Sequence, residues 1–354
     1  MARNLARRAS ARSPVLSYID TTSSAGSGDS SLNRIEKTLA FIDRAGLGLE
    51  VGPAHSPIAP RRAGFNVHVL DYMDADALRE KFRDVDVDLS QIEEVDFVWK
   101  GERLPELVGG TDRYDWIIAS HVIEHLPDLA GFLIDCQDLL KPEGVVSLVI
   151  PDKRYCFDCF RPLTTTGEIL DAFGQGRNRP SPGSVFENFA NCVTLDGEIS
   201  WSAGTSGKFE SPYSFEVARG FWGQATAGDY VDVHVSRFTP AGFRLITQDL
   251  KSLGLLRLEV THEFETTGNE FFVTLSQGAT RASAKDRVAI LRMVESELAE
   301  AIQDESIPEE PPEVSTSTLA VSPREESMIL FKRRMMDQIR KTFRHGGDRQ
   351  SGRG

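Results

Sequence analysis

The stretch Leu47-Gly-Leu-Glu-Val-Gly-Pro-Ala-His-Ser56 runs from a short apolar segment into an acid, Glu50, then a glycine, Gly52, and then a turn. About twenty residues later, a second apolar segment, Asn66-Val-His-Val-Leu-Asp71, ends on another acid,. On an open α/β sheet, such a glycine lets the backbone approach a nucleotide, and an acid after the next strand accepts hydrogen bonds from ribose hydroxyls. The two segments therefore favour a site for a nucleotide-containing cofactor.

Strands and helices alternate on both sides of this pair. Apolar residues at helical spacing predict a first helix over residues 32–46, capped by Ser30 or Ser31,. The further expected elements are a short helix at 74–82, strands at 95–100 and 115–121, a helix at 129–140 that stops at Pro142-Glu-Gly144, and a strand at 145–150. A helix beginning at Thr239-Pro240 and a strand pair at 255–264 and 270–277 follow later,.

The alternation pauses between residues 151 and 230, which hold 13 of the 30 aromatic residues and show no sustained periodicity. We interpret them as a substrate-cap insertion. The predicted organisation is a basic, disordered tail at 1–30, the main domain at 31–150 and 231–280, the cap at 151–230, a helix at 281–303, a linker at 304–326, and a basic helix and tail at 327–354,.

The charge distribution argues against nucleic acid as the main substrate. The formal net charge is −13, but residues 1–12 carry +4 and residues 332–354 carry +6, which leaves −23 on the body of the chain. An acidic body repels phosphate backbones. The basic tails can still make a weak contact with an anionic surface or a partner. The sequence shows no transmembrane segment, and its four cysteines fit a reducing, cytoplasmic location,.

The most specific motif is His121-Val-Ile-Glu-His-Leu126, which is followed by a helix and by Leu140-Lys-Pro-Glu-Gly-Val-Val146. With five βα units and a closing strand hairpin, the chain resembles the class I S-adenosylmethionine-dependent methyltransferases, closest to the type 11 group. The resemblance covers about residues 32–150 and 234–277,. It implies a Rossmann-like α/β sheet of seven strands with a C-terminal β-hairpin, the cap insertion after strand five, and S-adenosyl-L-methionine as cofactor. The phrases Ile150–Cys156 and Val235–Pro240 add a softer association with glycan or secondary-metabolite pathways.

The resemblance also implies roles for individual residues. Glu50 and Gly52 frame the methionine end of the cofactor, and Asp71 holds its ribose. The remaining expected cofactor contacts are Tyr72 and Glu102 at the adenine, and Ser120 and His121 after strand four. Ala54 stands where the family usually has a second glycine, so we expect this loop to lie slightly farther from the ligand.

Methyl transfer to a hydroxyl needs a base near the ends of strands four and five. The candidates are His125, Asp152 and His234. His125 also has a plain structural interpretation, as a residue at the start of a helix that caps backbone groups. Cys156-x-x-Cys159 with Cys192 lacks a second close ligand pair, so we expect no metal site there,.

The predicted activity is therefore methyl transfer to a hydroxyl of a small molecule or a glycan precursor. Two alternatives stay open. One is an NAD-dependent oxidoreductase on a related sheet, although the chain lacks Gly-x-Gly-x-x-Gly,. The other is a catalytically inactive, cofactor-binding scaffold, which the alanine at position 54 keeps open.

Overall fold

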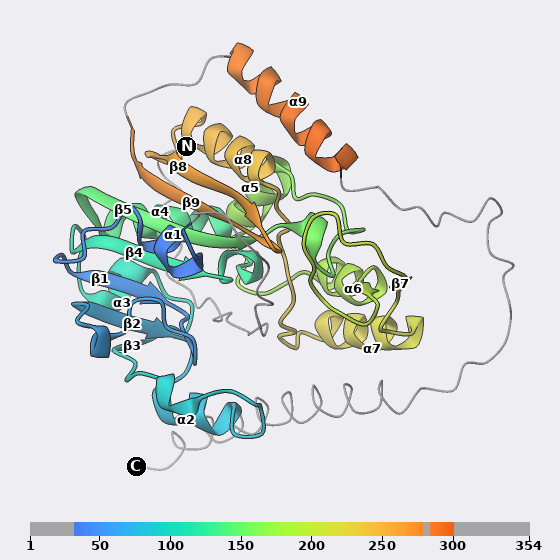
Figure 1. The fold of residues 1–354 in the computed structure, drawn as a ribbon, viewed down its shortest axis with the longest axis horizontal. Helices are drawn as coiled ribbons and strands as arrows, with labels where there is room; N and C mark the ends of the chain where they lie inside the picture. The colour runs from blue at the N-terminus through green and yellow to red at the C-terminus, as the bar shows by residue number, and fades with distance from the viewer. Residues whose placement is uncertain (1–31, 279–283, 301–354) are drawn as a thin grey trace, which may run out of the picture.

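The computed structural model describes residues 32–278 and 284–300. Its centre is a sheet of seven strands in the order β3-β2-β1-β4-β5-β9-β8 (Figure 1). The strands are β1 Gly48–Val51, β2 Val67–Asp71, β3 Phe97–Val98, β4 Tyr114–Ser120, β5 Leu140–Pro151, β8 Leu258–Thr267 and β9 Glu270–Gln277. The first five run parallel, and β9 runs antiparallel to both β5 and β8. The predicted Rossmann-like sheet with a C-terminal hairpin is therefore confirmed.

The strand order reverses direction between β1 and β4. The chain winds from β1 outward to β3 on one side and from β4 outward to β5 on the other, so the connections that leave β1 and β4 diverge. In open α/β sheets, ligands bind at the carboxyl ends of the strands beside such a switch point. Gly52, Asp71 and His121 lie at this edge, directly after or at the ends of β1, β2 and β4.

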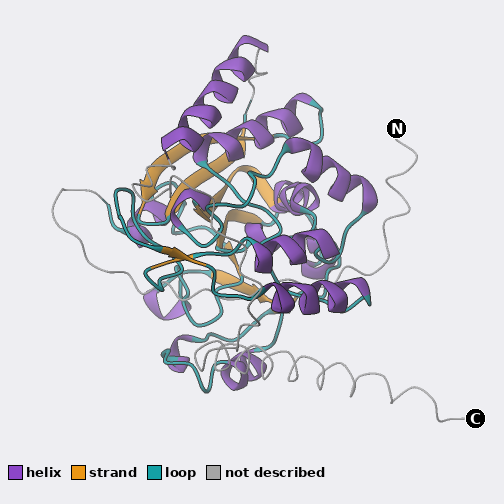
Figure 2. Cartoon of the chain, turned by 90° about the vertical axis from the view of Figure 1, so that its right-hand side faces the viewer, coloured by secondary structure: helices purple, strands orange, loops and turns teal. Residues whose placement is uncertain are grey.

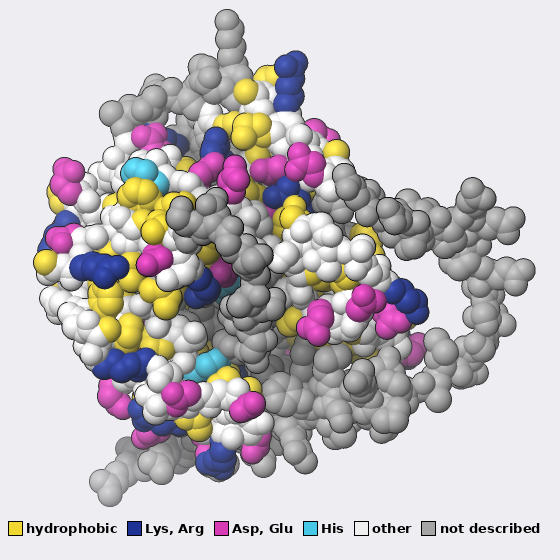
Figure 3. Space-filling model, in the orientation of Figure 1, with side chains coloured by type: hydrophobic (Ala, Val, Ile, Leu, Met, Phe, Trp, Pro, Cys, Tyr) yellow, Lys and Arg dark blue, Asp and Glu magenta, His cyan; other side chains and the backbone are white. Residues whose placement is uncertain are grey.

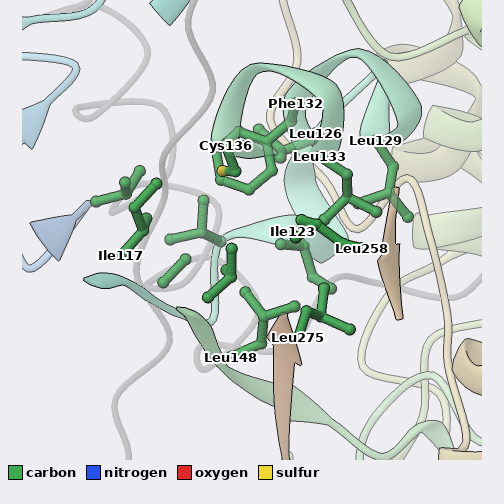
Figure 4. Close-up of a cluster of buried hydrophobic side chains, with 14 of the residues drawn as sticks. Ile117, Ile123, Leu126, Leu129, Phe132, Leu133, Cys136, Leu148, Leu258 and Leu275 are labelled. Carbon is green, nitrogen blue, oxygen red and sulfur yellow. The ribbon is translucent and has the colours of Figure 1, made fainter. Parts of the chain in front are cut away.

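Helices cover both faces of the sheet. On one face, α3 (Leu104–Val108), α4 (Leu129–Leu139) and α8 (Pro240–Ser252) bury their apolar side chains against the strands. Figure 4 shows part of this cluster, with Leu148 of β5 beside Leu275 of β9, and with Phe132 and Leu133 on α4 above them. On the other face, the short α1 (Arg34–Leu39) packs with the loop that follows β1. The inner strands β1, β2 and β4 are mostly buried, as expected for parallel strands covered on both faces,. In contrast, the edge strand β8 is largely exposed.

The insertion after β5 contains more regular structure than its sequence pattern indicated. It holds α5 (Thr166–Gln175), α6 (Pro182–Ala190), the strands β6 (Thr194–Leu195) and β7 (Phe209–Glu210), and α7 (Phe215–Thr226). The helices α6 and α7 form a separate apolar cluster, with the rings of Phe189 and Phe221 stacked 4.0 Å apart. In contrast, α5 packs Ile169 into the main core. Figures 1 and 2 show α6 and α7 side by side, beyond the edge of the sheet.

Several expected boundaries were wrong. The first helix is only six residues long, and Asn33 caps it through a capping box with Glu36 instead of Ser30 or Ser31. The chain passes from α4 directly into β5 at Leu140, so Pro142-Glu-Gly144 lies inside the strand and not in a loop. In contrast, Thr239 caps α8 with Pro240 at its first position, as predicted.

The other helices are α2 (Ala75–Lys81) and α9 (Ala284–Glu300), and single 3-10 turns occupy Arg61–Ala63, Leu89–Gln91, Ile123–His125 (η4) and Lys153–Tyr155. The predicted N-terminal tail, linker and basic C-terminal helix lie outside the described residues. Within the described part of the chain, no helix is long and apolar enough to cross a membrane.

Candidate functional site

The loop after β1 is fixed by the acid that precedes it. Glu50 is almost fully buried, and its two carboxylate oxygens accept hydrogen bonds from the backbone amides of Ile58 (2.6 Å) and Ala59 (3.1 Å). Burial raises the pKa of Glu50 to about 7, although the two amides oppose the shift. The expected cofactor contact therefore serves in this structure to hold the loop at residues 52–59, which lies beside the switch point.

The same loop contacts the end of β2. Gly52 and Ala54 both have left-handed backbone conformations, with φ of 67° and 45°. The amide of Ala54 donates to Oδ2 of Asp71 at 3.0 Å, and the amide of Tyr72 donates to Oδ1 at 2.8 Å. Asp71 is completely buried, which raises its pKa to about 6. The two segments that the sequence spacing singled out thus meet at one carboxylate.

This carboxylate fits the role of a ribose acceptor. An ionised carboxylate has about four lone-pair positions, so two backbone amides leave acceptor capacity for ribose hydroxyls,. The charge of Asp71 is also close to a cation, since the partly buried Lys81 of α2 interacts electrostatically with Asp71 and Asp232. We conclude that the residues at the end of β2 fit the sugar of a nucleoside cofactor.

Two lysines contact the residues that the sequence resemblance places at the adenine, Tyr72 and Glu102. Lys81 donates a hydrogen bond to the hydroxyl of Tyr72, and its Nζ lies 4.8 Å from the centre of the tyrosine ring. Glu102 follows β3, where one carboxylate oxygen accepts a hydrogen bond from the amide of Lys100 at 2.8 Å. The Nζ of Lys100 in turn donates to the carbonyl of Tyr72 at 3.1 Å. Glu102 and Tyr72 are therefore joined through one lysine.

The end of β4 is tied to two distant elements. Arg34 of α1 donates to Oγ of Ser120 at 2.6 Å and to Glu270 of β9 at 2.8 Å. Nε2 of His121 donates to the other oxygen of Glu270 at 2.8 Å, because a carboxylate can only accept,. His121 also has a φ of 51°, which is uncommon for a residue with a side chain,. These contacts fix the orientation of the predicted cofactor-lining residues.

Two of the three predicted catalytic residues lie together. The imidazole rings of His125 and His234 are perpendicular, with their centres 4.7 Å apart. Nδ1 of His125 donates to Asp232 at 3.1 Å, and Nδ1 of His234 donates to Asp158,. A carboxylate thereby orients each ring through Nδ1, so Nε2 is the nitrogen that does not contact this carboxylate.

Glu124 completes this group, which we call the histidine cluster: Glu124, His125 and His234. Glu124 is 0% exposed, and its Oε1 lies 4.0 Å from Nε2 of His125 and 3.5 Å from Nδ1 of His121. The carbonyl of Glu124 accepts hydrogen bonds from the amides of Val235 (2.7 Å) and Ser236 (2.9 Å), which hold the segment that carries His234 against η4.

The core of the domain keeps the cluster rigid. Ile123 and Leu126, which flank Glu124 and His125, are buried in the main core, as Figure 4 shows. The short 3-10 turn η4 therefore presents an acid and a histidine at the carboxyl edge of the sheet from a well-packed base.

The electrostatic surroundings shift the pKa values of the two histidines in opposite directions. Burial acts to lower the pKa of His125, but Asp232, Glu124 and Asp158 outweigh it and raise the pKa above its ordinary value. Burial lowers the pKa of His234, and Asp158 opposes this shift without reversing it. Asp158 is buried, yet Arg161 and His234 hold its pKa well below the usual range of aspartate.

Asp152, the third catalytic candidate, has other partners. Arg154 donates to both of its carboxylate oxygens, with the shortest contact at 2.7 Å, and Thr266 donates to it at 2.7 Å as well. Asp152 is completely buried and also forms a bridge with Phe238. The structure does not bring it into the histidine cluster, and its contacts join β5, β8 and the segment before α8.

Sequence reasoning missed the three acids that orient the imidazoles, Asp158, Asp232 and Glu270. It also gave no role to Glu124, Lys81 and Arg34. Glu124 stands next to His125 in the quoted motif, so it could have been noticed. The other partners are separated by 76 residues for the pair His234 and Asp158, and by 149 for His121 and Glu270. No local pattern indicates such pairs.

Comparison with known proteins assigns the fold to a family. Residues 30–180 match the profile described as a methyltransferase domain. No curated protein matches the chain. Similar solved structures include the CcbJ methyltransferase from Streptomyces caelestis, which is 12% identical, with a TM-score of 0.37, over 72% of this chain and 100% of that chain.

Two further similar structures are methyltransferases. The mitomycin 7-O-methyltransferase MmcR is 12% identical, with a TM-score of 0.33, over 69% of this chain and 53% of that chain. The 1,6-didemethyltoxoflavin-N1-methyltransferase from Burkholderia thailandensis is 10% identical, with a TM-score of 0.34, over 69% and 77%. These scores are low, so the assignment depends on the family profile and the sheet order. The profile match over residues 30–180 and the order of the seven-stranded sheet together support a class I S-adenosylmethionine-dependent methyltransferase.

Proposed function

We propose that this enzyme transfers a methyl group from S-adenosylmethionine to a hydroxyl of a small molecule or a glycan precursor. The observation that carries the proposal is the histidine cluster at the carboxyl edge of the sheet. A hydroxyl acceptor must lose a proton during the reaction, and His125 and His234 each have one nitrogen fixed on a carboxylate. Nε2 of His234 has no hydrogen-bond partner among the described residues, so it can accept a hydrogen bond from a hydroxyl.

The proposed cofactor site follows the edge of the sheet from β2 to β4. Asp71 would hold the ribose, Tyr72 and Glu102 would border the adenine, and Gly52 would let the loop approach the methionine part. Ser120 and His121 would line the cofactor between β4 and the cluster. Glu50 would hold the same loop in place through the hydrogen bonds that it accepts from the amides of Ile58 and Ala59.

The cofactor supplies a methyl group on a sulfonium, whose sulfur leaves as a thioether. The protein has to align the acceptor oxygen with the methyl carbon and the sulfur, which is mainly a matter of positioning. An oxygen–carbon bond forms while the carbon–sulfur bond breaks, and the hydroxyl proton passes to the histidine cluster. The products are the methyl ether, S-adenosylhomocysteine and a proton that returns to water.

The burial of the cluster favours a compact acceptor. Glu124, His125 and His234 are each no more than 2% exposed, beneath the segment of residues 230–236. A group that reaches them has to be enclosed by the protein. The face drawn in Figure 3 also shows basic side chains of the described residues scattered among acidic ones, without a single basic band. Both features support a small acceptor over a nucleic acid, and the cytoplasmic location stays a prediction.

The first test is calorimetric titration with S-adenosylmethionine, S-adenosylhomocysteine and NAD. We expect micromolar binding of the two adenosyl ligands, loss of that binding in Asp71→Ala, and no binding of NAD. Asp76→Asn is a matched control, because Asp76 is an exposed acid on α2 with a side chain 95% exposed. Binding of NAD alone by folded protein would contradict the proposed cofactor.

The acceptor class is then tested with paired hydroxyl and amine analogues of the same scaffolds, with methyl transfer followed by mass spectrometry. We expect turnover of hydroxyl compounds and at least a tenfold loss in His234→Gln, within the ordinary range for general acid–base catalysis of about 10²–10⁴. Turnover of amines only, or full activity of His234→Gln, would refute the proposal.

A further inference from the structure

We propose that Glu124, His125 and His234 bind a divalent transition-metal cation, of the kind that Zn²⁺ represents. Within the described residues, these three side chains each offer one ligand atom, and the three atoms lie within 4.8 Å of one another. The inference deepens the proposed function. The cation site itself is argued from the geometry of the cluster, and only the role of the cation in activating a hydroxyl rests on the proposed function.

The donor set has the chemistry that such a cation prefers. Two imidazole nitrogens and one carboxylate form a recurrent protein site for zinc, with a further position open for water or substrate. Imidazole ligands favour Zn²⁺ and its first-row neighbours, whereas Mg²⁺ prefers oxygen ligands alone. The cluster therefore favours a transition-metal cation over magnesium.

The surrounding carboxylates strengthen this interpretation. Histidines that bind a metal usually donate the other ring nitrogen to a carboxylate, which fixes the tautomer and the orientation of the ring. His125 donates to Asp232, and His234 donates to Asp158, in both cases through Nδ1,. In both rings Nε2 is the nitrogen that does not contact this carboxylate, and Nε2 of His125 lies 4.0 Å from Oε1 of Glu124.

The carboxylate of Glu124 provides an independent observation. It is completely buried, and neither oxygen has a hydrogen-bond partner among the described residues. Its ion-pair contacts in that part of the chain are with His121 and His125, and it has none with a lysine or arginine. Buried carboxylates are normally hydrogen-bonded, paired or bound to a metal. The unpartnered Nε2 of His234 lies in the same group.

A third histidine borders the cluster in the same manner. His121 contacts Glu270 through Nε2 and has Nδ1 3.5 Å from Oε1 of Glu124. A cation bound to the cluster would lie between the expected cofactor-lining residues and the segment 230–236. There it could contact an acceptor hydroxyl and make it more acidic, which is an ordinary function of a bound cation. The histidines would then act as ligands of the cation, and the proton of the hydroxyl would pass to water instead of to an imidazole. The methyl-transfer reaction of the proposed function would stay the same.

The inference is tested on the full chain after removal of any affinity tag. Calorimetric titration of chelator-treated protein with Zn²⁺, Co²⁺ and Mg²⁺ should give one equivalent of Zn²⁺ bound at micromolar Kd or below, and at least tenfold weaker Mg²⁺. The Co²⁺ protein should show visible absorption from a site with nitrogen ligands. Glu124→Gln, which keeps the shape of the side chain, should weaken Zn²⁺ binding at least tenfold.

Two matched variants separate the cluster from adventitious binding. Asp158→Asn should weaken Zn²⁺ binding by about 10–100-fold, the usual cost of losing the partner of a metal-bound histidine. His262→Gln should leave binding unchanged, because His262 is exposed on β8 and stacks on Phe41. Circular dichroism and S-adenosylhomocysteine binding report whether each variant is folded.

The inference is overturned if folded wild-type protein binds no stoichiometric Zn²⁺, or if folded Glu124→Gln binds it equally well. It is also overturned if His262→Gln removes the binding. Hydroxyl methylation by the chelator-treated protein would refute the role of the cation in activating the hydroxyl and leave the proposed function intact. Stoichiometric Zn²⁺ binding without turnover of any hydroxyl acceptor would support the metal site and refute the proposed function.

Discussion

Asp71 leads to the most direct prediction, a dependence of cofactor binding on pH. In the cofactor-free protein, burial raises the pKa of this carboxyl to about 6, against the opposing hydrogen bonds from the amides of Tyr72 and Ala54. Ribose hydroxyls donate hydrogen bonds, so they favour the ionised carboxylate over the protonated acid. The apparent affinity then equals the intrinsic affinity multiplied by the ionised fraction of Asp71.

The magnitude follows from the position of this pKa. At about pH 7 roughly nine-tenths of Asp71 is ionised, and at about pH 5 roughly one-tenth, so the Kd for S-adenosylhomocysteine should rise about tenfold on acidification. The α-amino group of the ligand, with a pKa of about 7.7–8.0, stays protonated throughout this range. The change in affinity therefore reports on the protein.

The assay is calorimetric titration at closely spaced pH values between these limits, with circular dichroism to confirm the fold. Asp71→Asn should bind weakly and without this slope, whereas Asp76→Asn should behave as wild type. Glu50 has a pKa of about 7, so Glu50→Gln should keep the slope if Asp71 causes it. A constant Kd in the wild type, or an unchanged slope in Asp71→Asn, would refute the reasoning.

Three further predictions concern stability, each measured by urea denaturation. Burial raises the folded-state pKa of Glu50 from 4.5 to about 7. The stability that this raised pKa provides is complete below the unfolded pKa of 4.5 and is lost as the pH rises from there through about 7,. The difference in unfolding free energy between wild type and Glu50→Gln should fall by about 3 kcal/mol over that window, and a constant difference would contradict the shift. Gly48→Ala should lower the unfolding free energy by about 3 kcal/mol, because the new Cβ would lie 2.1 Å from the ring of Trp116,; Gly174→Ala, with open space at its Cβ, is the control. Asp152→Asn should cost about 3–5 kcal/mol, because it leaves the buried Arg154 with only the exposed, more distant Glu300 as an ion-pair partner,. A fully stable but inactive variant would instead favour a catalytic role.

Much of the scaffold could be read from local patterns. The run of strand four is apolar along its length because both faces of a parallel strand are buried, and Thr239-Pro240 carries its own helix-start signal. The spacing singled out the glycine after strand one and the acid at the end of strand two, and the structure joins that loop to Asp71 through the amide of Ala54. The patterns failed where tertiary contacts override them, as at Leu140, where the helix ends and the strand begins without a loop.

The candidate site divides in the same way. The sequence by itself determined the sheet class, the position of Asp71 at a strand end, and the presence of Glu124 and His125 on one short motif. Only the tertiary structure decided that His234 meets that motif, that Asp158 and Asp232 orient the two imidazoles, and that Asp152 is held by Arg154. The physical reason is separation along the chain: His125 and Asp232 are 107 residues apart. Such a pair forms only when the packed core and the insertion bring its two segments to the same edge of the sheet, and no local periodicity records that encounter.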